Sequence, residues 1–446
     1  MTTHILSKAS RLATLAAAAA LAAPAAVLAA PLTVEDAIRA AWARNPALQA
    51  SAAQAEAARA DADRARDARL PTLSFTARAF RTDEPMMAFG TRLDQGRITM
   101  ADFDPARLND PPGIGGVGAG ASIQLPLFMG GRLLAGQSAA SAMAGAEGAS
   151  HAQRQREMAA GVVQAYFGAQ AAEEGVRYAE DLLAQAQETE RFVRQRAAQQ
   201  LALEADVARA VAFRAQAEAE RAAALQRRAT ARSALVMLAG DEVADAELTT
   251  PIDALPALPA GAAPPPERPD LLAARLQRDA AEAGVRAARG SLLPALFAQA
   301  SAETLRTPSL SDGTAWTMVG VMAKWDLSLG DARALRAAQA RATAAGDALV
   351  WREREAAREG GEARRAVDTA DARVRSAQEA VAASEEARRM RAARHRQGLL
   401  PLTDLLDAET GLAGARALLV ASRLEARVAR ARLALALNAP IEGLTP

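Results

Sequence analysis

The chain has 446 residues, of which half are apolar and only 3% aromatic, and its 53 basic and 52 acidic residues leave a formal charge of +1. Such a composition, rich in alanine, favours helices over a bulky globular core. The two signs of charge are interspersed, so no basic surface for nucleic acid is expected. Because the chain has no cysteine, disulfides, thiolate metal sites and a lipidated N-terminus are excluded.

Residues 1–29 have the pattern of a secretory signal peptide. Lys8 and Arg11 precede an alanine-rich apolar run that ends in small residues near Ala29. A retained transmembrane helix is the alternative, but the run is short and Pro24 interrupts it. We therefore expect cleavage close to Ala29 and export of the mature protein.

Beyond residue 31 the sequence contains an internal repeat. The matching segments are NPALQAS (45–51) with RPDLLAA (268–274), LPTLSF (70–75) with LPALFA (293–298), and LPLFMGGR (125–132) with WDLSLGDA (325–332). These matches predict a first structural repeat at 31–250, a proline-rich linker at 251–268, a second repeat at 269–438 and a tail at 439–446. The separation of matching segments falls from 223 to about 200 residues, so we expect a loop insertion in the first repeat.

Both repeats predict the same order of elements. Their ranges are helices at 46–69 and 269–292, β-hairpins at 71–128 and 294–328, long helices at 132–198 and 333–396, tip turns at 197–204 and 396–403, and returning helices at 204–238 and 404–437. The strands alternate apolar and polar residues over about ten positions, as membrane-barrel strands do. Ordinary half-buried hairpins would show the same alternation.

The long helices would each span roughly 100 Å at about 1.5 Å per residue, too far to be buried in a compact domain. The two shorter helices of each repeat would together match that length. We therefore expect a shaft of antiparallel helices, with both β-hairpins at one end and both tip turns at the other. A heptad row from Leu405 to Leu433, with leucine at every position except Ala426 and with small residues beside it, indicates close helix packing in the last helix.

Four strands cannot close a barrel, since about eight are needed. A lone sheet with one apolar face would aggregate. Several chains must then share one barrel, and three would give twelve strands and twelve helices. The expected fold class is mainly α, with a long antiparallel helical barrel and a membrane β-barrel closed by oligomerisation.

The residues LTVEDAI and NPAL, RPDLLAA, LPLFMGGR and GLLPLTDLLDAE together resemble the TolC family of outer-membrane efflux proteins. The resemblance covers nearly all of the mature chain. It implies a homotrimer in the outer membrane of a Gram-negative bacterium, extending into the periplasm. It also implies docking to a periplasmic adaptor, or membrane fusion protein, and to an inner-membrane pump of RND, ABC or MFS type. A periplasmic helical adaptor or scaffold that forms no channel is the alternative interpretation.

By similarity to the family's DxxD segment, Asp404 and Asp407 are expected to form acidic rings at the periplasmic entrance. The alternative is that both acids only stabilise a helix N-terminus. The residues predicted to dock the adaptor are Gln200, Leu201, Asp206, Gln397, Gly398 and Leu399. Gly398 suits a turn with positive φ, and Asp404 is expected to cap the returning helix. Gln200 replaces the glycine in the first copy, which suggests a turn of different shape.

His395 lies near these acids and would make opening sensitive to pH if it faced them, although a solvent-facing side chain is favoured. In the inserted loop (86–112), Asp102, Asp104, Asn109 and Asp110 suggest a calcium loop, but their spacing does not fit an EF-hand, and an ordinary polar extracellular loop is favoured. Three methionines there, Met86, Met87 and Met100, are a weak hint of soft-metal export.

An aromatic belt at the membrane surface would have to come from Phe75, Phe80, Phe128, Trp316 and Trp325. The three histidines lie in separate predicted elements, so we expect no catalytic, cofactor or metal site. The sequence does not indicate the exported substrate.

Overall fold

The computed structural model describes residues 31–258 and 267–445. The predicted signal peptide and part of the proline-rich linker therefore lie outside the described residues. Among the helices that are described, none is both long and apolar enough to cross a membrane. The chain forms two compact units, and each unit takes residues from both sequence repeats. In the described chain the first comprises 31–48, 155–258 and 359–445, and the second comprises 49–154 and 267–358.

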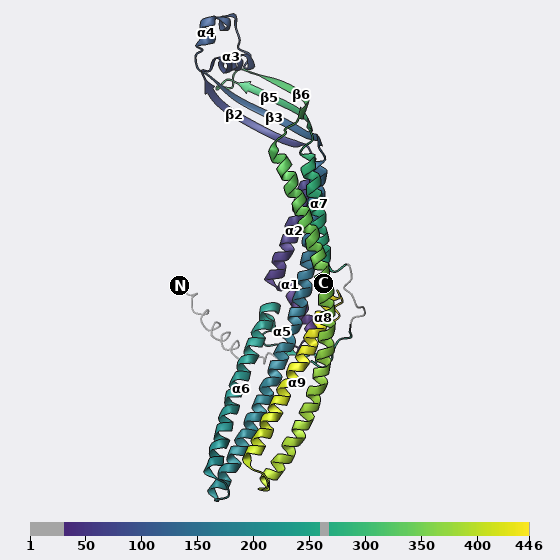
Figure 1. The fold of residues 1–446 in the computed structure, drawn as a ribbon. Helices are drawn as coiled ribbons and strands as arrows, with labels where there is room; N and C mark the ends of the chain where they lie inside the picture. The colour runs from purple at the N-terminus through teal and green to yellow at the C-terminus, as the bar shows by residue number, and fades with distance from the viewer. Residues whose placement is uncertain (1–30, 259–266, 446) are drawn as a thin grey trace, which may run out of the picture. The chain divides into compact units, whose positions relative to one another are not determined.

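The second unit contains a four-stranded antiparallel sheet in the order β2-β3-β5-β6. Its strands are β2 (Thr72–Thr82), β3 (Ile114–Met129), β5 (Ala295–Arg306) and β6 (Gly313–Lys324). Figure 1 shows the four strands side by side. The two repeats meet where β3 pairs with β5, and the pairing shifts between Pro126 and Phe128. Proline has no N–H for the ladder, so such an irregularity accommodates it.

The register assigns side chains to two chemically different faces of the sheet. The row Leu73, Ile123, Ala300 and Val319 lies on the apolar face. The adjacent row Ser74, Ser122, Ser301 and Met318 lies on the other face, which also carries Arg78, Gln124, Gln299 and Glu303. This face is called the polar face below. The predicted alternation therefore extends across all four strands.

The helices of the second unit attach to one end of this sheet, and its loops join the strands at the other end. They are α2 (Pro46–Asp67), α7 (Pro269–Gly290) and the first parts of α5 (Arg132–Ala198) and α8 (Leu329–Arg396). The turn between β5 and β6 is short, whereas β2 and β3 are joined by the predicted insertion. We call the end with the connecting loops the loop end of the sheet.

The insertion folds into helical turns: α3 (Pro85–Asp94), the 3-10 helix η1 (Met100–Phe103) and α4 (Pro105–Asn109). Asp102 accepts hydrogen bonds from the backbone and hydroxyl of Thr99 and pairs with Arg92, while Asp104 caps α4. These two acids therefore have structural roles in helix capping. The insertion is more ordered than the plain polar loop that the sequence favoured.

The first unit is built from helices α1 (Val34–Arg44), α6 (Glu204–Ala239), α9 (Leu402–Ala436) and the remaining parts of α5 and α8. Short parallel strands β1 (Pro31–Leu32) and β4 (Glu247–Leu248) pair beside the 3-10 helix η2 (Asp241–Val243). The two long helices have 67 and 68 residues. Helix α1, which the sequence analysis did not anticipate, buries Val34 and Ile38 against Val162 and Phe167 of α5.

The heptad row of α9 lies in the core. Leu405, Leu412, Leu419, Ala426 and Leu433 are all buried, and so are Ala408, Ser422, Ala429 and Ala436 of the small-residue row. Ala426, Ala429 and Leu433 pack against Val367 and Ala370 of α8. The periodic pattern thus predicted which face of α9 meets its neighbours.

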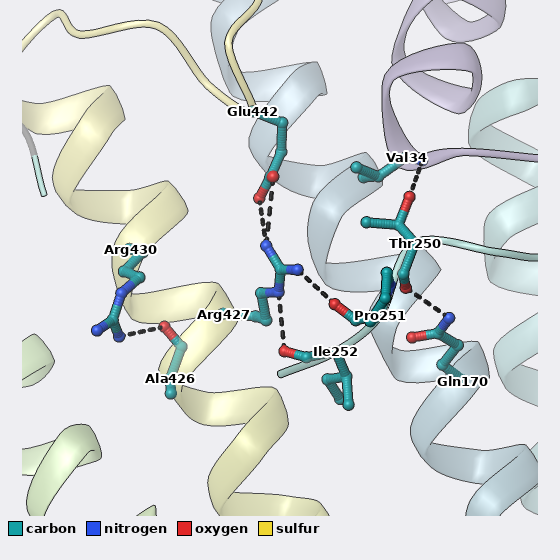
Figure 2. A network of polar contacts seen from close by, with 9 residues as sticks. All are labelled: Val34, Gln170, Thr250, Pro251, Ile252, Ala426, Arg427, Arg430 and Glu442. Atoms are coloured by element: carbon teal, nitrogen blue, oxygen red, sulfur yellow. Dashed lines mark hydrogen bonds and ion pairs between the residues drawn. The ribbon is translucent and has the colours of Figure 1, made fainter. Parts of the chain in front are cut away.

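Arg427 of α9 connects the linker and the C-terminal tail, as Figure 2 shows. Its guanidinium donates to the carbonyl oxygens of Pro251 and Ile252 and pairs with Glu442. The same group lies 4.2 Å from the ring centre of Phe167. Nearby, Thr250 accepts a hydrogen bond from the backbone N–H of Val34. Three distant segments of the chain are therefore held at one point in the first unit.

Candidate functional site

The two tip turns, residues 199–203 and 397–401, have the same backbone hydrogen-bond pattern. Leu201 N–H donates to the Arg196 carbonyl at 2.9 Å, and Leu399 N–H donates to the Arg394 carbonyl at 3.0 Å. Gln200 and Gly398 both have positive φ, at 61° and 76°. This is the Schellman ending of a helix. The expectation that Gln200 would give the first turn a different shape is therefore wrong.

Helix α9 begins at Leu402 and has Pro401 as its N-cap. The prediction that Asp404 caps the helix is wrong, because Asp404 is the third helical residue. Its counterpart Asp206 has the same place in α6, whose N-cap is Leu203. The core explains the early start, since Leu402 is buried against Val193 and Ala210. Burial of this leucine places the helix start two residues before the acid.

Asp404 is half-buried and Asp407 is exposed, and both belong to the first two turns of α9. Thr403 Oγ1 lies 3.5 Å from Asp404 Oδ1, and Arg391 donates to the backbone carbonyl of Asp404. Within the described part of the chain, neither carboxylate forms an ion pair. Arg209 occupies the position of Asp407 in the first copy. A pair of acids at these two positions, three residues apart, is thus a feature of the second copy alone.

The two tip turns lie close together around a cavity of about 160 Å³. Leu201, Asp206 and Gly398 of the predicted docking set line it, together with Arg196 and Leu402. Gln200, Gln397 and Leu399 do not line this cavity and are exposed. The exposed Leu203, which sequence analysis did not select, adds to Leu201 and Leu399 a third large apolar side chain on these turns.

His395 is part of the contact between the two hairpins. Its Nδ1 lies 2.9 Å from the carbonyl oxygen of Leu400, which can only accept, so this nitrogen is assigned the proton. The ring packs edge-on against Phe192 of α5. The favoured expectation of a solvent-facing histidine is therefore wrong. Its neighbour was not identifiable from sequence, because Phe192 belongs to the other repeat.

The sequence analysis also missed the polar contacts that α9 makes with α5 and α8. Arg416 lies 3.7 Å from Asp181 and packs over the ring of Tyr178, and it pairs with Glu385 of α8. Arg423 lies 3.5 Å from Glu174 of α5. Charged residues at helical spacing gave no signal of these partners, because the pairs join helices that are far apart in sequence.

The predicted aromatic belt is not confined to one face of the sheet. Phe75 lies on the apolar face opposite Ala121, whereas Phe80 and Trp316 lie on the polar face. Trp325 follows β6 and donates its indole N–H to the carbonyl of Leu292, and Phe128 lies at the bulge of β3. A membrane-facing role thus stays a prediction that suits Phe75 better than Phe80 or Trp316.

A comparison with protein families completes this description. The family model described as outer membrane efflux protein matches residues 37–241 and 266–439. The chain belongs to this family. It is accordingly an outer membrane efflux channel of the TolC family, a transport protein and not an enzyme, that extends into the periplasm. This sets aside the alternative of a periplasmic scaffold that forms no channel.

Solved structures have the same fold. A membrane protein from Pseudomonas aeruginosa is 24% identical, with a TM-score of 0.79 and coverage of 91% of this chain and 93% of that chain. The CmeC channel of Campylobacter jejuni is 15% identical, with a TM-score of 0.80 and coverage of 92% of this chain and 86% of that chain. The open state of the Neisseria gonorrhoeae MtrE channel is 23% identical, with a TM-score of 0.77 and coverage of 93% of this chain and 90% of that chain. A comparison with curated proteins finds no match.

Proposed function

We propose that this efflux channel is a homotrimer that works in a tripartite assembly with a periplasmic adaptor and an inner-membrane pump of RND, ABC or MFS type. The four-stranded sheet is the observation that carries the proposal. Strands β2 and β6 are its two edges, and one face exposes Leu73, Phe75 and Val319. Unpaired edges and a large apolar face are unfavourable in water. Closure into a barrel pairs the two edges, and lipid around the barrel covers the apolar face.

Three copies would supply twelve strands, more than the roughly eight that a filled barrel needs, and would leave a lumen. The polar face, with Arg78, Gln124 and Glu303, is suited to line this lumen. The apolar face is suited to outer-membrane lipid. The number three follows the family resemblance, and the division of faces follows the strand register.

In the first unit, Asp404 and Asp407 would form two acidic rings around the three-fold axis of the trimer. Their lack of ion-pair partners among the described residues supports this role, because a paired carboxylate would contribute less to the potential in a pore. Acidic rings attract cations and repel anions. The exposed leucines of the tip turns, Leu201 and Leu399, offer the adaptor an apolar contact surface.

Single-channel recording of the full chain in planar bilayers tests the acidic rings. We expect Asp404→Asn/Asp407→Asn to lower the preference for cations over anions, because the substitution removes charge with little change in shape. Asp206→Asn is the matched control, since Asp206 has the same third position in α6. A control that lowers selectivity as much as the double variant would indicate a general helix-terminus effect. Unchanged selectivity in the double variant would contradict the rings.

A further inference from the structure

The inserted segment between β2 and β3 covers part of the polar face at the loop end of the sheet. The covered side chain is Leu305 of β5, which is only 1% exposed. In the register, Leu305 lies opposite Gly118 and Thr314, in the row that contains Arg78. A leucine that is buried on the polar face needs an apolar cover.

Glycines of β3 leave the room in which Leu305 lies. A Cβ at Gly116 would lie 3.0 Å from Leu305 Cδ1 and 3.1 Å from the Phe80 ring. A Cβ at Gly118 would lie 3.1 Å from Arg78 and 3.3 Å from Leu305. These contacts independently place Phe80, Arg78 and Leu305 on one face. Side chains from β2 and β5 thus lie over the glycines of β3. We call the surface formed by Arg78, Phe80 and Leu305 the platform.

Helix α3 is attached to this platform and packs against β3, β5 and β6. Gln95, just after the helix, donates its amide to the carbonyl oxygens of Gly115 and Arg306 at 2.8 and 3.2 Å. Thr314 donates its hydroxyl to the Asp94 carbonyl. Gly96 approaches Thr314 so closely that a Cβ there would lie 2.9 Å from Thr314 Cγ2. Because Thr314 shares a row with Leu305, these contacts hold α3 on the polar face.

The orientation of α3 follows from its burial. Ala88, Thr91 and Gln95 are buried, and they lie on one side of a helix with 3.6 residues per turn. Met86 and Leu93 lie on the opposite side and are 78% and 54% exposed. Two apolar side chains therefore point away from the sheet on its polar side. Figure 1 shows α3 and α4 at the loop end of the strands.

We propose that α3 forms a hydrophobic constriction at the outer exit of the channel, lined by Met86 and Leu93 from each copy. The proposal rests on the proposed trimer, in which the polar face surrounds the lumen. The loop end lies opposite the attached helices, so the constriction lies at the extracellular mouth. An apolar ring can limit ion flow by excluding water, unlike the acidic rings proposed for the tip.

The chain has no cysteine, so single cysteines can be introduced for cross-linking between copies. In the trimer extracted in detergent, we expect a short bifunctional maleimide to convert Met86→Cys chains into covalent dimers and trimers, because the side chains face one axis. Ser309→Cys is the matched control, exposed at the turn between β5 and β6. We expect it to react equally with a monofunctional maleimide but to give no cross-linked products.

Conductance provides the second readout. Leu93→Asp should raise single-channel conductance and the preference for cations, since a charged ring stays hydrated, whereas Leu93→Ile should leave both unchanged. The proposal is overturned if Met86→Cys is fully labelled in an intact trimer but does not cross-link, or if Leu93→Asp conducts as the wild type does. Light scattering measures the oligomeric state and so shows which proposal fails. A chain that is not trimeric contradicts the proposed function. An intact trimer without cross-links contradicts the constriction alone.

Discussion

Arg427 is a charged residue with an exposed fraction of 1%. Burial lowers the pKa of its guanidinium and raises the pKa of the Glu442 carboxyl, and the opposite charge of each partner counteracts these shifts. Two carbonyl oxygens and the face of Phe167 complete the environment. A buried charge in such a site is tolerated only while its partners remain. The arginine therefore matters more for joining segments than for net attraction.

Replacing Arg427 with methionine should lower the free energy of unfolding by about 3 to 5 kcal/mol, because Glu442 would remain buried without its partner. The control is Arg432→Met, which changes an exposed arginine of the same helix. Chemical denaturation followed by circular dichroism would measure both. Equal stability of the two variants would mean that the buried contacts of Arg427 contribute nothing.

The two helical hairpins end in the same turn despite different residues at the left-handed position. Gly398 adopts positive φ readily, whereas Gln200 has a Cβ that makes this conformation unfavourable by roughly 1 to 2 kcal/mol. A Cβ at Gly398 would come no closer than 3.6 Å to Arg196, so space is not limiting there. The difference between the turns is therefore one of backbone strain.

We expect Gln200→Gly to stabilise the first turn by about 0.5 to 1 kcal/mol, since relief of strain exceeds the added flexibility of the unfolded chain. Gly398→Gln should destabilise the second turn by about 1 to 2 kcal/mol. Local hydrogen exchange of the backbone amides at 196–206 and 394–404 would measure each effect. Faster exchange around residue 200 in the glycine variant would contradict this account.

Internal repetition and periodicity predicted the helices, hairpins and α9 seam because these depend on patterns within one segment. The start of α9 was misjudged because capping preference favoured Asp404, whereas burial of Leu402 against the other hairpin decided the boundary. His395 and Arg416 were misjudged or missed for a related reason. Their partners, Phe192 and Asp181, belong to the other repeat, and a single sequence gives no signal of such contacts.

At the scale of the whole molecule, the two faces of the sheet determine where the protein can reside. Val319 and Met318 are adjacent in the middle of β6, with Val319 on the apolar face and Met318 in the serine row. In the single chain Val319 is 84% exposed, although it is an aliphatic side chain. Such exposure is understandable if lipid replaces water on that face.

Val319→Arg should destabilise the membrane-inserted protein by about 2 to 4 kcal/mol, because the charge would face the middle of the bilayer. Met318→Arg should be tolerated, because its side chain would face the lumen. Refolding into lipid vesicles, followed by protease protection, would compare the two. Equal loss of insertion would contradict the assignment of faces.

The strand directions restrict how copies can associate. Strand β2 runs from the attached helices toward the loop end, and β6 runs back. Antiparallel pairing of β2 with β2 of a second copy would invert that copy and put its helices beyond the opposite end of the sheet. Pairing of β6 with β2 of the next copy keeps every chain in the same orientation. In the proposed trimer the contact is therefore head-to-tail, and such contacts generate rings in place of two-fold dimers. Every incomplete assembly of this kind keeps one free β2 edge and one free β6 edge, and only closure of the ring pairs both.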